Sequence, residues 1–210
     1  MKYIKTGTGI VFNPADTHRG WEYSEKDGSF VPSDMEDVNR LLLEETTDEA
    51  TEKEFRTDIV CKTNNLIVWT EKARNMAKER HKGQKDKGGH DYFECHVSKV
   101  ADIASELFGG GYLPIIAYLH DILEDTETTE TELHDNFPPE VVEAVITLTR
   151  KNGERYADYI QRVKGNDLAV KVKTIDLLQN LDLTRIPEHT PEDENRVYKR
   201  YVPALTELFR

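Results

Sequence analysis

A histidine and three carboxylates follow directly on an apolar segment in the stretch LHDILEDTETT, which runs from Leu119 to Thr129. The preceding residues 115–118 read IIAY, and the run 113–123 is apolar nearly all round, which is typical of a helix in the centre of a domain. Burying charged groups costs several kcal/mol unless a partner or a metal ion compensates. The fold must therefore bring a compensating group to the end of this central helix.

The chain has 210 residues, enough for one good core with an appendage, or at most two small domains. No apolar run of about 18 residues and no signal-peptide pattern occurs, so we expect no membrane span and a cytoplasmic location. Cys61 and Cys95 show no metal-finger spacing, which agrees with a reducing compartment. The net charge of −12 argues against nucleic acid as a partner. A small anionic substrate remains compatible with it, because a bound cation can attract one.

Two zones of the sequence differ in pattern. In residues 1–65, the β-like runs 21–24 and 29–31 flank Asp27-Gly28, which predicts a hairpin. From Leu66 onward the periodicity predicts helices at 69–82, 96–108, 113–123, 140–150, 154–163, 167–183 and 191–209. Thr129-x-x-Glu132 is a capping-box signature for one more short helix. We therefore predict a mainly α protein: a helical bundle at 66–210 and an N-terminal extension at 1–65 with short β pieces.

Four side chains interrupt the apolar helices in a way that favours a metal site. His120 and Asp121 supply an imidazole and a carboxylate, which together suit Mn, Fe, Zn or a similar divalent ion. Two ligands do not hold a catalytic metal, so further ligands should come from other helices. His96 opens the apolar helix at 96–108, and Asp176 lies inside the apolar run VKTIDLL. Each could be a hydrogen-bonded core residue if taken alone. Together they could be directed at one point inside a bundle.

The carboxylates of Glu124 and Asp125 follow one helical turn later. The pair could serve as an acid–base group beside a metal ion, provided the charge of one raises the pKa of the other. It could also be a solvated helix end, in which Asp125-Thr126 caps the following turn.

The order H…HD…D on successive helices is the pattern of the HD phosphohydrolase superfamily. RHKGQ at 80–84, KGG at 87–89 and YFxxHVxxVA at 92–101 resemble the start of the RelA/SpoT-type hydrolase domain. LHDILEDTxTT at 119–129 is similar to its central motif, TLTR at 147–150 to a short segment after it, and VKxxDxxxNL at 172–181 to its closing motif. The resemblance covers residues 66–210 and implies an HD-domain helical bundle. Because no synthetase-type sequence accompanies it, we expect a small stand-alone alarmone hydrolase.

The resemblance also implies roles for individual residues. It implies four ligands for one Mn²⁺ ion per chain: His96, His120, Asp121 and Asp176. Glu124 and Asp125 would orient and deprotonate the attacking water. Asn180 would contact the nucleotide sugar, and Lys87 would pack on guanine or face a phosphate.

The implied reaction is hydrolysis of the 3′-pyrophosphate of guanosine tetra- or pentaphosphate, (p)ppGpp, to pyrophosphate and GDP or GTP, an activity of the stringent response. Basic side chains beside the motifs can neutralise the phosphates of such a small-molecule nucleotide. They are Lys82, Lys85, Lys87, Arg150, Lys151, Lys171 and Lys173. Of these, Lys85, Lys87 and Arg150 are the candidate substrate-binding residues.

Departures from the family leave alternatives open. Val97 stands where the family usually has a proline, Leu177 replaces a basic residue, and Gln179 replaces a histidine. Because these changes border the nucleotide, the substrate could be another one: a nucleoside monophosphate, a signalling nucleotide or a 3′-phosphorylated dinucleotide. A non-catalytic nucleotide-sensing protein is the third reading.

The role of the extension at 1–65 is likewise open. It could cover the active site, form the contact of a homodimer or bind a partner. The simpler alternative is that Trp21, Tyr23 and Phe30 form a small core of its own.

Overall fold

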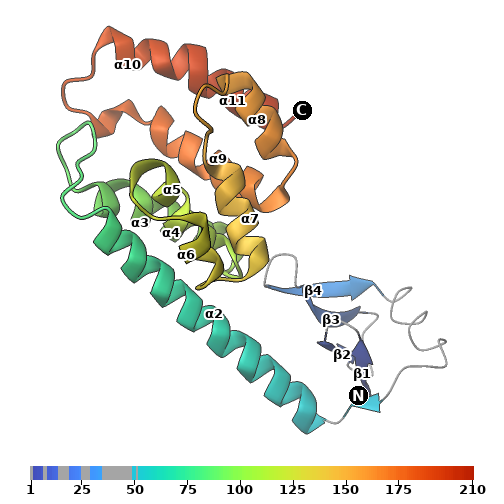
Figure 1. Cartoon of the computed structure of the whole chain (residues 1–210). Coiled ribbons are helices and arrows are strands. Elements are labelled where there is room, and N and C mark those ends of the chain that lie inside the picture. The colour runs from blue at the N-terminus through green and yellow to red at the C-terminus, as the bar shows by residue number, and fades with distance from the viewer. Residues whose placement is uncertain (1, 7–8, 14–18, 25–28, 35–48, 51) are drawn as a thin grey trace. The chain divides into compact units, whose positions relative to one another are not determined.

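A computed structural model describes the backbone of residues 2–6, 9–13, 19–24, 29–34, 49–50 and 52–210, and the side chains from residue 64 onward. The chain divides into two compact units, Met1–Val68 and Trp69–Arg210. The first contains the described strands, and the second is helical (Figure 1).

The N-terminal unit contains one antiparallel sheet with the strand order β4-β3-β2-β1-β5. Its strands are β1 (Lys2–Thr6), β2 (Gly9–Asn13), β3 (Arg19–Ser24), β4 (Ser29–Asp34) and β5 (Glu49–Ala50). Strands β3 and β4 pair from Arg19 opposite Asp34 to Ser24 opposite Ser29, as expected of the predicted hairpin. The Asp27-Gly28 turn and the side chains proposed as a small core lie outside the described residues.

Helix α2 (Glu52–Arg80) is much longer than the predicted helix at 69–82. The prediction followed apolar periodicity, which is weak between residues 52 and 65. That segment contains no glycine or proline and several good helix formers, so propensity rather than amphipathicity favours a helix there. No helix in the described part of the chain is both long and apolar enough to cross a membrane.

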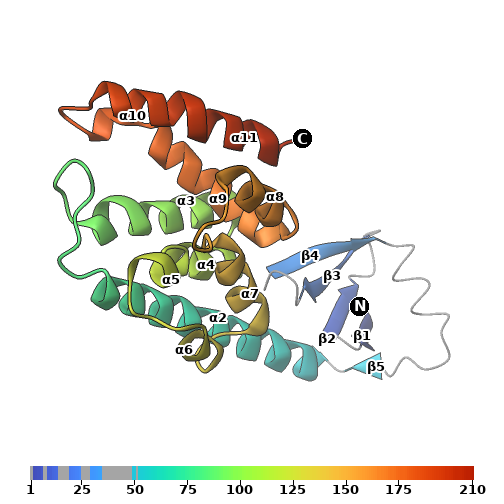
Figure 2. The same cartoon turned by 45° about the horizontal axis from the view of Figure 1, so that its top comes forward.

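The helical unit confirms the prediction of a mainly α bundle. After α2 its elements are η1 (Phe93–Val97, a π-turn), α3 (Ser98–Phe108), α4 (Leu113–Leu119), α5 (Ile122–Asp125), α6 (Glu130–His134), α7 (Pro139–Leu148), α8 (Tyr156–Lys164), α9 (Asp167–Leu181), η2 (Leu183–Arg185), α10 (Pro191–Arg196), η3 (Val197–Tyr201, a second π-turn) and α11 (Val202–Leu208). Helix α9 packs against α3, α4, α7, α8 and α11, and Figure 2 shows α3, α4 and α9 side by side.

The central helix α4 is buried on all sides, as its composition predicts. All seven of its residues are buried, and it packs against α3, α7 and α9. The predicted continuous helix at 113–123 is wrong, however, because α4 ends at Leu119 and α5 begins at Ile122. Asp121 adopts φ −105° and ψ 0°, and its carbonyl accepts hydrogen bonds from the backbone N–H groups of Glu124 and Asp125. His120 and Asp121 therefore lie at a bend between two helices.

The capping box predicted at Thr129 forms only in part. The Thr129 side chain accepts a hydrogen bond from the backbone N–H of Glu132 and so caps α6. The carboxylate of Glu132 does not bond back to the cap; it accepts a 2.6 Å hydrogen bond from Arg80 at the end of α2. Glu132 therefore links α6 to α2 instead of closing the box.

The guanidinium of Arg162 stabilises the loop between α7 and α8. Arg162 on α8 donates to the carboxylate of Glu154 at 2.9 and 2.8 Å. It also donates to the carbonyls of Thr147 and Thr149 at 2.8 and 3.0 Å, where α7 ends. These bonds fix the loop that carries Arg150.

Replacing Arg162 with methionine should lower the free energy of unfolding by about 1–3 kcal/mol, because partly buried hydrogen bonds to a charged group are lost and two carbonyls lose their donor. Urea unfolding followed by circular dichroism measures this change. The matched control is Arg155→Met, which removes an exposed ion pair with Asp158 and should leave the midpoint nearly unchanged. Equal effects of the two substitutions would contradict the assigned role of Arg162.

Candidate active site

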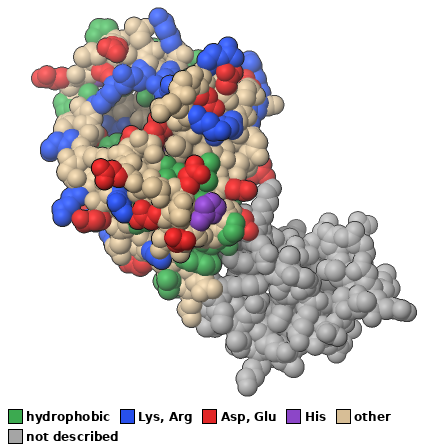
Figure 3. All heavy atoms as spheres, in the orientation of Figure 1, with side chains coloured by type: hydrophobic (Ala, Val, Ile, Leu, Met, Phe, Trp, Pro, Cys, Tyr) green, Lys and Arg blue, Asp and Glu red, His purple; other side chains and the backbone are tan. Residues whose placement is uncertain are grey.

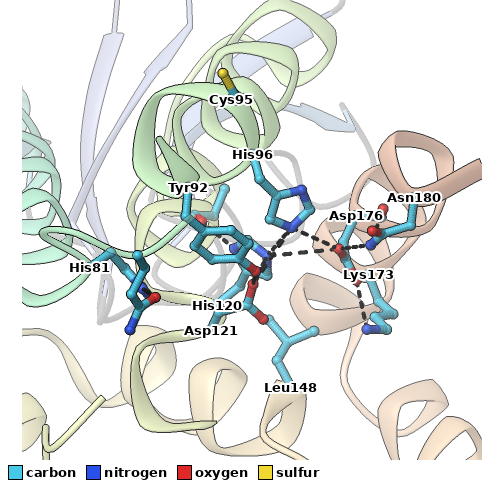
Figure 4. Close-up of polar contacts among 12 residues, drawn as sticks. His81, Tyr92, Cys95, His96, His120, Asp121, Leu148, Lys173, Asp176 and Asn180 are labelled. Atoms are coloured by element: carbon cyan, nitrogen blue, oxygen red, sulfur yellow. Dashed lines mark hydrogen bonds and ion pairs between the residues drawn. The ribbon is translucent and has the colours of Figure 1, made fainter. Parts of the chain in front are cut away.

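Four side chains from three separate segments converge inside the helical unit. His96 comes from η1, His120 and Asp121 from the bend between α4 and α5, and Asp176 from the middle of α9 (Figure 4). The Nε2 atom of His96 lies 3.2 Å from Oδ1 of Asp176 and 3.5 Å from Oδ2 of Asp121. The Nε2 atom of His120 lies 2.9 Å from Oδ2 of Asp121 and 3.3 Å from Nε2 of His96. The bundle thus brings together all four residues expected to be metal ligands.

The spacing of these atoms suits a single divalent ion. Ligand atoms about 2.0–2.2 Å from one ion lie roughly 3–3.5 Å from one another. His96, His120 and Asp176 are buried, and their ligand atoms all lie within 4.8 Å of one another. Burial disfavours a charged His96, yet Asp121 and Asp176 outweigh that effect and raise its pKa to about 9. The cluster therefore attracts positive charge, which a metal ion would supply.

Neighbouring groups orient these side chains. The Nδ1–H of His120 donates a 2.7 Å hydrogen bond to the carbonyl of Ala117, which leaves the lone pair of Nε2 directed into the cluster. Asp176 accepts 2.6 Å hydrogen bonds from Lys173 at Oδ2 and from Asn180 at Oδ1. Burial opposes ionisation of Asp176, but Lys173 and the histidines outweigh it and hold its pKa below the usual range. Asp176 is thus an ionised carboxylate with a fixed direction.

Tyr92 is a site residue that the sequence analysis did not single out. Its hydroxyl donates a 2.6 Å hydrogen bond to Oδ2 of Asp121, the oxygen that faces both histidines. Its ring lies between those of His81 and His96, with centroids 5.4 and 5.2 Å away. The spacing of four residues between Tyr92 and His96 was the available signal, because such residues share one face of a helical turn.

Glu124 and Asp125 line a cavity of about 180 Å³ that also reaches His96, Asp121 and Asp176, here called the metal-facing cavity. The carboxylate of Glu124 accepts a hydrogen bond from the backbone N–H of Arg150 at 3.2 Å. Burial raises the pKa of Asp125 to about 6, and the charges of Asp121 and Glu124 add to the rise. A carboxylate with such a pKa is suited to accept a proton near neutral pH.

The candidate substrate-binding residues divide between two cavities. Arg150 lines the metal-facing cavity, whereas Lys85 and Lys87 line a second one of about 230 Å³, here called the outer cavity. Both cavities are lined by Tyr92, His96, Asn180 and Tyr201. The ammonium group of Lys87 pairs with the carboxylate of Asp193 on α10, and that of Lys85 donates to the carbonyl of Gly89 at 3.0 Å.

The outer cavity also has walls that the motifs did not indicate. Arg185, Arg196 and Tyr201 contribute to it from the segment after α9. Sequence reasoning missed them because they lie outside the motifs and reach the cavity only through the packing of η2, α10 and η3. Figure 3 shows Lys and Arg side chains bordering a hollow in this face of the helical unit.

Comparisons with known proteins agree with this geometry. The model of the HD domain family matches residues 73–194. The chain is 32% identical over 119 residues to the guanosine-3′,5′-bis(diphosphate) 3′-pyrophosphohydrolase of Aquifex aeolicus. This alignment covers 53% of this chain and 17% of that protein. The chain is also 37% identical over 79 residues to the GTP pyrophosphokinase rsh of Brucella melitensis. This second alignment covers 38% of this chain and 10% of that protein. The chain thus spans only a small part of these relatives.

A solved structure shares the fold. It belongs to a metazoan orthologue of SpoT described as hydrolysing ppGpp and acting in starvation responses, and it matches with a TM-score of 0.58 and 23% identity. The match covers 68% of this chain and 85% of that one. Because the family model covers more than half of the sequence, the chain belongs to the HD-domain family, and the RelA/SpoT-type resemblance is confirmed.

Replacing Tyr92 with phenylalanine should weaken binding of a divalent metal by about 10–100-fold, the usual effect of losing a hydrogen bond to a metal ligand. His120→Ala should abolish binding, because it removes a ligand outright. Calorimetric titration with Mn²⁺ measures both. The controls are Tyr198→Phe and His134→Ala, which change exposed residues away from the cluster and should bind as wild type does. Unchanged affinity in the Tyr92 variant would show that its hydroxyl does not orient Asp121.

Proposed function

We propose that this member of the HD-domain family hydrolyses the 3′-pyrophosphate of guanosine tetra- and pentaphosphate, releasing pyrophosphate and GDP or GTP. The observation that carries the proposal is the convergence of two histidines and two carboxylates beside the Glu124-Asp125 pair in a cavity bordered by cations. The similarity to the Aquifex aeolicus enzyme of that name supports the choice of substrate.

The metal in this proposal is one Mn²⁺ ion per chain. His96, His120, Asp121 and Asp176 would hold it, since a mixture of imidazoles and carboxylates suits Mn²⁺. A divalent ion bound there would lower the pKa of a water molecule and polarise a phosphoryl oxygen.

The two carboxylates would have different roles toward the attacking water: one orients it and the other accepts its proton. Glu124 is positioned by the backbone N–H of Arg150 and would accept a hydrogen bond from the water, which orients it toward phosphorus. Asp125, with its pKa raised to about 6, would take the proton as the new oxygen–phosphorus bond forms. The bond between phosphorus and the 3′ oxygen would break and pyrophosphate would depart. The 3′ oxygen would take up a proton from solvent, to which Asp125 would release the one it had accepted.

The two cavities would hold different parts of the nucleotide. Asn180 lines both and donates to Asp176, so it lies where a sugar between the 3′-diphosphate and the base would pass. The outer cavity offers apolar walls from Leu183 and Ile186 for a base. Lys85 and Lys87 add positive charge there for 5′-phosphates.

We place this activity in residues 66–210, because every described residue of the site lies in that range. We further propose that the enzyme acts in the cytoplasm. The extension at 1–65 would then serve another purpose, such as the contact of a homodimer. Size-exclusion chromatography with light scattering on the full chain and on residues 66–210 tests that contact.

Purified protein with Mn²⁺ should release pyrophosphate and GDP from guanosine tetraphosphate, because the site supplies a metal, a base and a cationic cavity. Ion-exchange chromatography of the products measures this. A panel containing a nucleoside monophosphate and a 3′-phosphorylated dinucleotide, scored by kcat/KM, tests the substrate. Faster turnover of another panel member would assign the enzyme to that substrate, and no turnover of any would remove the catalytic proposal.

Glu124→Gln should keep the metal and lower kcat by about 10²–10⁴-fold, because general acid–base catalysis contributes about that much and Asp125 depends on Glu124 to orient the water. Metal content by mass spectrometry and initial rates are measured on the same preparation. Glu127→Gln, an exposed change three residues away, is the control and should retain full activity. A metal-free Glu124 variant would instead make Glu124 a ligand.

A further inference from the structure

The lining of the metal-facing cavity includes cationic side chains that the proposed mechanism does not use. Its lining combines four carboxylates, those of Asp121, Glu124, Asp125 and Asp176, with three cations, those of Arg150, Lys173 and Arg200. The rings of Tyr156 and Tyr159, also in the lining, lie against Arg200 and Lys173. A divalent ion would change the formal charge of the lining from one negative to one positive. The metal-loaded cavity is thus suited to an anion that extends from the carboxylates to the cations.

Lys173 is already engaged by the protein. Its ammonium group donates to Oδ2 of Asp176 at 2.6 Å and lies 5.3 Å from the ring centroid of Tyr159. Burial disfavours the charged lysine, but Asp176 outweighs this and raises its pKa. Lys173 therefore neutralises a ligand carboxylate and offers little to a substrate.

Arg200 is in a different situation. Its guanidinium carbon lies 4.1 Å above the ring centroid of Tyr156, and its buried Nε–H has no hydrogen-bond acceptor among the described residues. No carboxylate of the described region forms an ion pair with it. By contrast, Arg162 on the neighbouring α8 bonds Glu154 and two carbonyls. An arginine held in place by stacking, with its buried Nε–H unpaired and no carboxylate partner among the described side chains, is suited to bind an anion.

Tyr156 adds a second unpaired group at the same place. It is the first residue of α8, and its buried hydroxyl has no acceptor for its proton within the described part of the chain. Burial raises its pKa, and the positive charges of Lys173 and Arg200 oppose that rise. A buried hydroxyl whose proton has no acceptor is unfavourable. A phosphate oxygen would accept from both Tyr156 and Arg200.

We propose that Arg200 and Tyr156 bind the terminal phosphate of the 3′-diphosphate and so select a diphosphate over a monophosphate at the 3′ position. This inference rests on the proposed function. The phosphorus bonded to the 3′ oxygen lies beside Glu124 and Asp125, where water attacks. The terminal phosphate stays on Arg200 and Tyr156 as the 3′ oxygen–phosphorus bond breaks, so these residues also hold the departing pyrophosphate. Charge-assisted bonds from a guanidinium fork and a hydroxyl suit such a group.

The test compares wild type with Arg200→Gln and Tyr156→Phe. Calorimetric titration of the metal-loaded protein measures the Kd of inorganic pyrophosphate and of orthophosphate. The free Mn²⁺ concentration is the same in the calorimeter cell and in the syringe. Arg200→Gln should weaken pyrophosphate binding about tenfold or more, equivalent to about 1.4 kcal/mol. Tyr156→Phe should weaken it several-fold. Lys199→Gln removes an exposed positive charge from the same π-turn and should bind as wild type does.

Substrate selection gives the second readout. We measure kcat/KM for guanosine tetraphosphate and for guanosine 5′-diphosphate 3′-monophosphate. Wild type should favour the diphosphate, and Arg200→Gln should reduce that preference about tenfold, whereas Lys199→Gln should keep it. If Arg200→Gln does not fold, Arg200→Lys replaces it and should still lose several-fold in pyrophosphate affinity, because lysine lacks the guanidinium fork.

The outcomes separate this inference from the proposed function. Pyrophosphate affinity that is the same in folded Arg200 and Tyr156 variants as in wild type would overturn the inference, even if guanosine tetraphosphate is hydrolysed. Pyrophosphate binding that depends on Arg200, in a protein that hydrolyses neither guanosine nucleotide, would support the anion site and refute the proposed substrate.

Discussion

The need to place positive charge among two imidazoles and two carboxylates inside a helical core is the constraint on which this structure depends. Two Nε2 atoms 3.3 Å apart, with carboxylate oxygens 2.9–3.5 Å away, have no favourable arrangement without a proton or a metal ion between them. Local geometry follows from this requirement. A π-turn carries His96, and the bend after α4 directs His120 and Asp121 to one side. An uninterrupted helix at 113–123 would lack this bend and would direct the two side chains differently.

Support for the cluster extends to the motif RHKGQ at the end of α2. The amide nitrogen of Gln84 donates to the carbonyl of Asp125 at 2.8 Å, so its oxygen is left to accept from Nδ1–H of His81, also at 2.8 Å. His81 is fully buried, and burial lowers its pKa, which favours this neutral tautomer. Its ring packs on Tyr92, which in turn bonds Asp121. The motif therefore supports both Asp121 and the Glu124-Asp125 turn from one side, which explains its proximity to the site.

Periodicity and residue chemistry were enough to predict the helical bundle and to choose four side chains that the fold brings together. They were not enough for the bend at Asp121, because an apolar run is equally compatible with one helix or two, and tertiary packing decides. The early start of α2 was missed because its first turns follow propensity instead of an apolar stripe. Tyr92 could have been found from its spacing to His96. Arg200 and Tyr156 could not, because they meet only where η3 packs beside α8 and α9, far from any motif.

Metal and substrate should bind this site as coupled ligands. The chain carries a net charge of −12, and four carboxylates line the metal-facing cavity against three cations, so an anionic nucleotide meets net repulsion there until a divalent ion is present. The ion would reverse the sign of the net charge in the cavity, and the low polarity of a buried cluster strengthens this effect. Because binding of the two ligands is thermodynamically linked, the nucleotide increases the affinity for the ion by the same factor as the ion increases the affinity for the nucleotide. An acidic protein could thus bind a highly charged anion selectively, because a divalent ion would turn the metal-facing cavity from repulsive to attractive.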